Sequence, residues 1–245
     1  MIGALIAINP SLGLAQSLKA DAKSCTQQWL EKRQTLPSNQ QYTRKVADAF
    51  GRDCLDIKGT KRIDWSTVKK DLDEITLADD KQLSSLQPPD IATLCPKYLS
   101  ANNEQRRNFW LEFLIDVIKP EAGTNAYSIM WEQPLLKNGD PDPERGEYSI
   151  GLLQLSISNR SPYNCSIPTE ASLLDQKVNL ACGVKILTYL VSREGIGGDS
   201  GHGRWGAARY WSTLRVISEK PKAAGGNETR KPIINTLRQL PQCKN

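Results

Sequence analysis

Apolar residues at helical spacing dominate the stretch from 104 to 119. The members of this stripe are Phe109, Trp110, Phe113, Leu114, Val117 and Ile118. Apolar side chains three and four positions apart share one face of a helix, so this helix must be buried in a core. Similar spacing predicts helices over 22–34, 42–55, 66–75, 173–191, 205–215 and in a last segment ending near Cys243. Because no strand alternation or repeat is found, the sequence predicts an all-α fold.

Prolines set the expected limits of two helical segments. Pro120 lacks an amide hydrogen and clashes with the preceding turn, so the central helix should end or kink there. This places Glu121 at the end of a helix. Pro88 and Pro89 should interrupt any helix within residues 83–94.

The first residues resemble a secretory signal. Residues 2–14 are almost all apolar and uncharged, and Gly13 and Ala15 are small residues where a signal peptidase reads the chain. A basic residue after Met1 is missing, and Pro10 lies inside the apolar run. A run of about 14 residues is short for a membrane span. We therefore expect cleavage after Ala15, no stable membrane insertion, and a secreted or periplasmic protein.

Six cysteines lie far apart, at Cys25, Cys54, Cys95, Cys165, Cys182 and Cys243. There is no C-x-x-C pair, and His202 is the only histidine, so we expect no metal site. An even count behind a secretory signal predicts up to three disulfides. We favour the pairs Cys165–Cys182, Cys25–Cys54 and Cys95–Cys243. Only the first has a specific reason, namely that a loop cysteine would pin a nearby helix cysteine.

Charge and motif patterns argue against two function classes. Lys and Arg number 32 against 27 Asp and Glu, a net charge of +5, but these charges are scattered and not interleaved with aromatics. We therefore expect no nucleic-acid partner. The Gly-Asp-Ser-Gly string at 198–201 matches the surroundings of a trypsin-like serine nucleophile. The single histidine follows Ser200 by two positions, which does not fit such an enzyme.

Several segments in one order resemble the lysozyme-like domain of soluble lytic transglycosylases and goose-type lysozymes. They are Glu121 after the central helix, Trp131-Glu132-Gln133-Pro134, Tyr148-Ser149-Ile150-Gly151-Leu152-Leu153-Gln154, Asn179 with Gly183, and Ala208-Arg209-Tyr210. In the family, the matching pieces include a helix ending in the catalytic glutamate, a Gly-Leu-Met-Gln-like turn, an Asn-x-x-x-Gly helix and an Ala-x-Tyr helix. The similarity covers roughly residues 95–215.

The resemblance implies an architecture. A lysozyme-like helical domain is expected over 95–245. A helical, disulfide-pinned N-terminal extension over 16–94 would precede it, behind a signal peptide at 1–15. The resemblance also implies an enzyme that needs no cofactor and cleaves the β-1,4 bond between N-acetylmuramic acid and N-acetylglucosamine in peptidoglycan glycan strands. We expect it to act as a monomer.

The resemblance also assigns roles to individual residues. Glu121 becomes the general acid and base, and Gly151 lets the backbone pass close to the glycan. The predicted substrate-binding residues are Glu132, Ser149, Gln154, Tyr163 and Tyr210. Of the aromatic residues Trp131, Tyr163, Trp205 and Trp211, any could stack on sugar rings, although helical spacing favours a core position for Trp205.

The chain departs from the family at Ala122 and at Ser156, and the departure at Ser156 leaves the second carboxylate open. Ala122 follows the glutamate where the family commonly has serine, and Ser156 stands where goose-type enzymes usually have aspartate. The candidates for a second carboxylate are Glu132, Asp140, Asp142 and Glu147. The acidic loop that holds the two aspartates lacks the glycine and the glutamate of a calcium-binding loop, so we expect no calcium there.

The expected environment of Glu121 suits acid catalysis. A glutamate packed among Trp110, Phe113 and Tyr210 would have its pKa raised by desolvation, which keeps the proton available near neutral pH. Hydrolysis and transglycosylation both remain open, as does action on chitin-like or deacetylated glycans. The alternative from another class is a non-catalytic glycan-binding or lysozyme-inhibiting protein that retains the fold.

Overall fold

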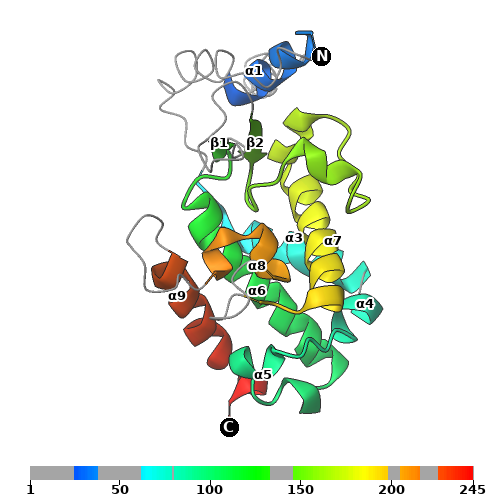
Figure 1. The fold of residues 1–245 in the computed structure, drawn as a ribbon, viewed down its shortest axis with the longest axis vertical. Helices are drawn as coiled ribbons and strands as arrows, with labels where there is room; N and C mark the ends of the chain where they lie inside the picture. Colours follow the sequence, from blue (N-terminus) through cyan, green and yellow to red (C-terminus); the bar gives the residue numbers. More distant parts are fainter. Residues whose placement is uncertain are drawn as a thin grey trace, which may run out of the picture.

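The computed structural model describes residues 25–37, 62–78, 80–132, 146–197, 205–215 and 226–244 of the 245-residue chain (Figure 1). The α-helices are α1 (Cys25–Gln34), α3 (Trp65–Ala78), α4 (Asp80–Ser84), α5 (Ile91–Leu94), α6 (Asn103–Ala122), α7 (Gln176–Glu194), α8 (Ala207–Tyr210) and α9 (Gly226–Arg238). Short 3-10 helices are η1 (Tyr98–Ser100), η2 (Ile157–Arg160), η3 (Glu170–Leu174), η4 (Ser212–Leu214) and η5 (Pro241–Cys243). The predominance of helices is as predicted.

Helix α6 runs through the middle of the molecule (Figure 1). It begins at a capping box, in which Asn102 accepts from the backbone N–H of Gln105 and the Gln105 side chain accepts in return. These bonds satisfy N–H groups that have no partner inside the helix. The helix continues two residues beyond Pro120, so it does not end there, and the alternative of a kink stays a prediction. A proline in the last turn removes one backbone bond.

A two-stranded antiparallel hairpin is the main departure from the predicted all-α fold. Strand β1 (Ile129–Glu132) pairs with β2 (Glu147–Ile150), and Trp131 and Glu132 lie opposite Tyr148 and Glu147. Four residues per strand are too few for a clear alternation in the sequence. The hairpin is held by packing, because an isolated hairpin of this size is marginal in water.

The described part of the N-terminal extension packs directly on the rest of the chain. Helix α3 lies against α6 and α7, and α4 lies against α6. Their buried apolar side chains belong to the same core cluster as those of α6 and α7, for example Leu72 and Leu83. The interruption predicted at Pro88 and Pro89 separates α4 from α5 and is confirmed.

Two of the predicted disulfides are confirmed. Cys165 is bonded to Cys182, and Cys95 is bonded to Cys243 near the C-terminus. Cys54, the predicted partner of Cys25, lies outside the described residues, as do the predicted signal peptide and the helix predicted over 42–55. Within the described part of the chain, no helix is long and apolar enough to cross a membrane.

The helix predicted over 205–215 is broken into two short pieces, α8 and η4. Gly206 has a φ of +56° and precedes α8 as its N-cap, and Trp211, with extended backbone angles, separates the two pieces. Trp205 is half-exposed, so the prediction that it is a core residue is wrong. Trp211 takes the core position instead and is completely buried.

Candidate active site

Glu121 lies in the last turn of α6, where the chain turns toward the hairpin. Its Oε1 accepts a hydrogen bond of 2.9 Å from the hydroxyl of Thr213 in η4. Burial raises the pKa of Glu121 above its usual value, the Thr213 bonds lower it, and the nearby Glu132 carboxylate raises it again. The positive charge of Arg215 lowers the pKa of Glu121. The net effect favours the protonated carboxyl.

Two of the three aromatic residues expected around Glu121, Trp110 and Phe113, lie elsewhere. Trp110 and Phe113 are completely buried and contact Phe109 and each other, two to three helical turns before Glu121. Each turn of helix advances about 5.4 Å, so these rings cannot surround the carboxyl. The structure instead places η4 against α6, with Thr213 bonded to Glu121, a contact that the sequence pattern does not predict.

The hairpin brings two further carboxylates together. Glu132 and Glu147 are directly opposite each other in the register, so their side chains share one face of the hairpin. A serine hydroxyl binds each of them: Ser149 donates to Glu132 and Ser156 donates to Glu147. Like charges opposite each other destabilise a sheet, so this pairing costs the hairpin stability.

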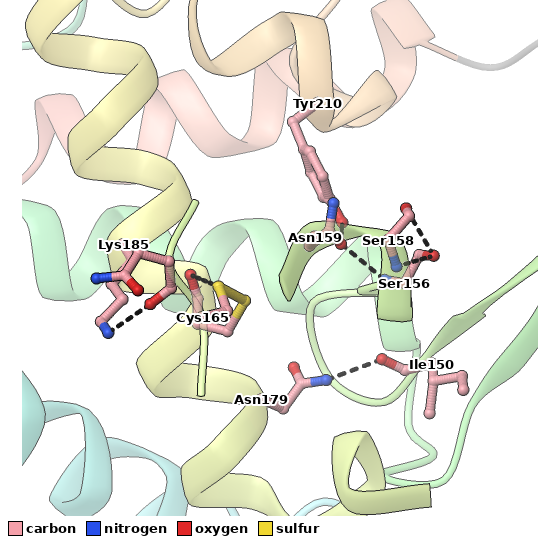
Figure 2. The surroundings of a disulfide bond; sticks show 10 residues. Ile150, Ser156, Ser158, Asn159, Cys165, Asn179, Lys185 and Tyr210 are labelled. Carbon is pink, nitrogen blue, oxygen red and sulfur yellow. Dashed lines mark hydrogen bonds between the residues drawn. A yellow bond between two sulfur atoms is a disulfide. The ribbon is translucent and has the colours of Figure 1, made fainter. Parts of the chain in front are cut away.

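Tyr210 connects α8 to this carboxylate face. Its hydroxyl donates a hydrogen bond of 2.5 Å to Oδ1 of Asn159, and the same oxygen accepts from the backbone N–H of Ser156 at 2.8 Å (Figure 2). Burial raises the pKa of Tyr210 well above its usual value, and the carboxylates of Glu132 and Glu147 raise it further. Tyr210 is thus a neutral hydrogen-bonding group beside the acidic face.

The turn at 151–154 is locked to helix α7. Asn179 is completely buried, and its amide donates to the carbonyls of Ile150 at 2.8 Å and Leu173 at 3.0 Å (Figure 2 shows the bond to Ile150). Its Oδ1 accepts from the backbone N–H of Leu153 at 2.9 Å. These three bonds fix the turn that carries Gln154.

Gly151 is required by this packing. It has a φ of +77°, and a Cβ there would lie 2.5 Å from the Leu173 carbonyl oxygen and 2.6 Å from Asn179 Nδ2. The close approach is therefore to this chain's own η3 and α7, and a close passage of the backbone at Gly151 along the glycan stays a prediction. Glycine alone tolerates both the angle and the contact.

Gln154 points into the turn. It is buried, with a φ of +49°, and its Nε2 donates to the carbonyls of Gly151 at 2.7 Å and Ser128 at 3.2 Å. Its Oε1 is buried and has no hydrogen-bond partner among the described residues. A substrate contact of Gln154 stays a prediction.

The candidate stacking residues divide into two kinds. Trp211 is buried and donates to the Leu153 carbonyl at 3.2 Å, so it is a core residue and cannot stack on a sugar. Tyr163 is half-buried, with its ring centroid 6.2 Å from that of Tyr210. Trp131 is also half-buried and packs edge-on against Tyr148, with the two ring centroids 4.8 Å apart. Tyr163 therefore lies next to Tyr210, and its stacking on a sugar stays a prediction.

The predicted site residues Glu121, Glu132, Ser149 and Tyr210 are brought together, and Thr213 and Asn159 join them. No sequence pattern indicated Thr213. Asn159 lies in a polar turn, and nothing in that local pattern sets it apart. It joins the site only through its hydrogen bond with Tyr210 of α8. Asp140 and Asp142 lie outside the described residues. Among the described residues, no group of three His, Cys, Asp or Glu side chains could hold a metal ion.

This arrangement can support acid–base chemistry. Burial raises the pKa of Glu121, so this carboxyl tends to hold its proton, and Glu132 and Glu147 each accept a hydrogen bond from a serine hydroxyl. Two carboxyl groups in different environments can divide the roles of acid and base.

Solved structures of Bd0314 DslA, a Bdellovibrio protein, are similar to this chain. The wild-type structure has a TM-score of 0.60 and 30% sequence identity, and the match covers 75% of this chain and 94% of that one. Two glutamate-to-glutamine variants match with TM-scores of 0.61 and 0.60 and with 29% and 30% identity. Their substituted glutamates lie 11 positions apart. No family model matches this chain, and no curated protein matches it.

Proposed function

The chain belongs to the same family as DslA, and from this premise we propose that it is a peptidoglycan-cleaving glycosidase. Its target would be the β-1,4 bond between N-acetylmuramic acid and N-acetylglucosamine. The observation that carries the proposal is the Glu121 carboxyl, which is half-buried at the end of α6, bonded to Thr213 and close enough to Glu132 for their charges to interact. Lysozyme-like enzymes break glycosidic bonds with such a carboxyl.

Glu121 acts in this proposal as the general acid. Cleavage of a glycosidic bond requires a proton on the leaving oxygen, and the raised pKa of Glu121 keeps that proton available at higher pH than an exposed glutamate would. Tyr210 and Gln154 would contact the sugar from α8 and from the turn.

Glu132 is the second carboxylate of the proposal. The separation of Glu121 and Glu132 is 132 − 121 = 11 positions, which equals the separation of the two glutamates substituted in DslA. This agreement supports both residues as the functional pair. A second carboxylate favours hydrolysis, because it can activate water or attack the sugar, whereas transglycosylation needs only one.

The test is digestion of purified peptidoglycan by wild-type protein, Glu121→Gln and Glu132→Gln, with the products identified by mass spectrometry. We expect each variant to lose at least about 100-fold in rate, the usual scale for general acid–base groups. Glu112→Gln is the matched control, because Glu112 lies on the same helix and pairs with Lys69 at the surface. It should retain wild-type activity.

The products distinguish the mechanisms. Muramic acid with a free reducing end indicates hydrolysis, and 1,6-anhydro-muramic acid indicates transglycosylation. Full activity of Glu121→Gln would remove Glu121 from the mechanism. Binding of glycan strands by an inactive wild-type protein would favour the non-catalytic alternative.

The proposed place of action is the cell exterior or the periplasm. Disulfides such as Cys95–Cys243 and Cys165–Cys182 form and persist in oxidising compartments. Peptidoglycan is found in the same compartments. Fractionation of cells that express the full chain would test this location.

A further inference from the structure

Helix α1 places a charged side chain inside the protein. Arg33 is only 1% exposed, and its Nη2 forms an ion pair with Oε2 of Glu170 in η3, whose side chain is 2% exposed. Helix α1 packs against η3, at the end of the molecule that carries the hairpin (Figure 1). Moving two charges out of water is costly, so a buried pair of this kind is weak as a device for stability alone.

Arg33 also contacts the hairpin, through the ring of Tyr148. Its guanidinium carbon lies 4.5 Å from the centroid of the Tyr148 ring, within the range of a cation–π contact. Tyr148 is 1% exposed and lies in the middle of β2. The N-terminal extension therefore contacts the strand that carries Glu147 and Ser149.

The contact between Arg33 and Tyr148 lies on the opposite face of β2 from Glu147 and Ser149. Successive side chains of β2 point to opposite faces, so Glu147 and Ser149 share one face and Tyr148 points to the other. On β1, Glu132 shares the face of Glu147, its partner in the register. Arg33 thus contacts one face of the hairpin, and the opposite face carries the carboxylates of Glu132 and Glu147.

We propose that Arg33 is a positioning residue for the reaction proposed above, fixing the hairpin through Tyr148 so that Glu132 stays beside Glu121. The hairpin needs this support for two reasons. It has only four residues in each strand, and it carries two like charges directly opposite each other. This inference rests on the proposed function and gives the N-terminal extension a part in it.

The test uses the full chain with Arg33→Met and Glu170→Gln combined. Replacing only one partner would leave the other charge buried and unpaired, which is strongly destabilising, whereas removing both charges at similar volume is often neutral. The matched control combines Lys69→Met with Glu112→Gln, which removes the more exposed ion pair between α3 and α6. Circular dichroism and cooperative unfolding establish that both double variants fold.

We expect kcat on peptidoglycan to fall at least about 10-fold with little change in KM, because small displacements of catalytic groups cost this much or more. The alkaline limb of the pH–rate profile should also move to lower pH. The reason is that Glu132 raises the pKa of Glu121, and a displaced Glu132 would do so less. The control should match the wild type in kcat and in pH profile.

Amide hydrogen exchange measures the hairpin without reference to activity. Peptides covering 129–132 and 146–150 should exchange faster in the Arg33→Met/Glu170→Gln variant, while α6 and α7 keep wild-type protection. Unchanged hairpin exchange together with wild-type kinetics would overturn the role of Arg33. Absence of glycan cleavage by the wild-type protein would contradict the proposed function instead, and hairpin exchange would still decide whether Arg33 orders this face.

Discussion

The hydroxyl of Thr213 donates a hydrogen bond to the carboxyl of Glu121 across 2.9 Å, although 92 positions separate the two residues. Glu121 ends the central helix, and Thr213 lies in the short 3-10 helix η4 that follows α8. This contact links the proposed acid to the C-terminal part of the chain. It also opposes the effect of burial on the pKa of Glu121.

Replacing Thr213 should therefore change the pH dependence of activity. The Thr213 bond stabilises the charged form of Glu121, so Thr213→Val should raise the pKa of Glu121 further. The alkaline limb of the pH–rate profile should then move to higher pH, as measured by peptidoglycan digestion at a series of pH values. Thr236→Val, a change at an exposed position within α9, should leave the limb unchanged. A limb that moves to lower pH would contradict this reading.

Glu121→Gln should stabilise the protein while it abolishes activity. Because burial raises the pKa of Glu121 above 4.5, the folded state holds the proton more tightly than the unfolded chain. The free energy of unfolding therefore falls as pH rises from 4.5 through the folded-state pKa. Glutamine does not ionise, so the variant does not lose this part of the free energy of unfolding as pH rises. We expect a higher Tm than wild type at pH 7 and a smaller difference below pH 4.5, and an equal difference at both pH values would disprove the linkage.

Asn179→Ala should destabilise the fold strongly. The change leaves the carbonyls of Ile150 and Leu173 and the N–H of Leu153 without their side-chain partner. Each buried group left unpaired costs about 1–3 kcal/mol, so we expect a loss of about 3 kcal/mol or more in urea unfolding. Asn103→Ala, at an exposed position of α6, should change stability by less than about 0.5 kcal/mol. A similar small change for Asn179→Ala would show that the turn does not depend on it.

The two disulfides should contribute unequally to stability. Cys165 and Cys182 are 17 positions apart, and Cys95 and Cys243 are 148 apart. In the chain-entropy model the shorter loop contributes roughly 3 kcal/mol and the longer one roughly 5 kcal/mol. Paired Cys→Ser variants, compared by urea unfolding, should therefore lose more stability at Cys95 and Cys243. The reverse order would indicate that native-state contacts outweigh loop entropy.

The sequence pattern predicted the helical core well because burial of a helix face is a local property. The stripe from Phe109 to Ile118 repeats every three to four residues, and α6 buries it as expected. The Cys165–Cys182 bond was predicted for a similar reason, since its cysteines are close in the sequence. The hairpin was missed, because four residues in each strand hold too little alternation.

The surroundings of the site residues could not be predicted from local patterns. Glu121 was placed at a helix end from Pro120, but its environment was predicted wrongly: Trp110 and Phe113 lie two to three turns away, and Thr213 takes their place. Trp205 and Trp211 exchanged their expected positions. Helical spacing could not decide between them once the segment broke into two short pieces.

The sequence by itself determined which segments form the core and which residue types are available for chemistry. The tertiary structure decided which of them meet. Glu121, Glu132 and Tyr210 come from a helix end, a hairpin and a short helix, and the packing of α6, β1 and α8 brings them together. The pKa of a carboxyl depends on burial and on charges within a few ångströms, and these belong to the folded chain alone. A site assembled from distant segments is therefore a property of the packing that encloses it.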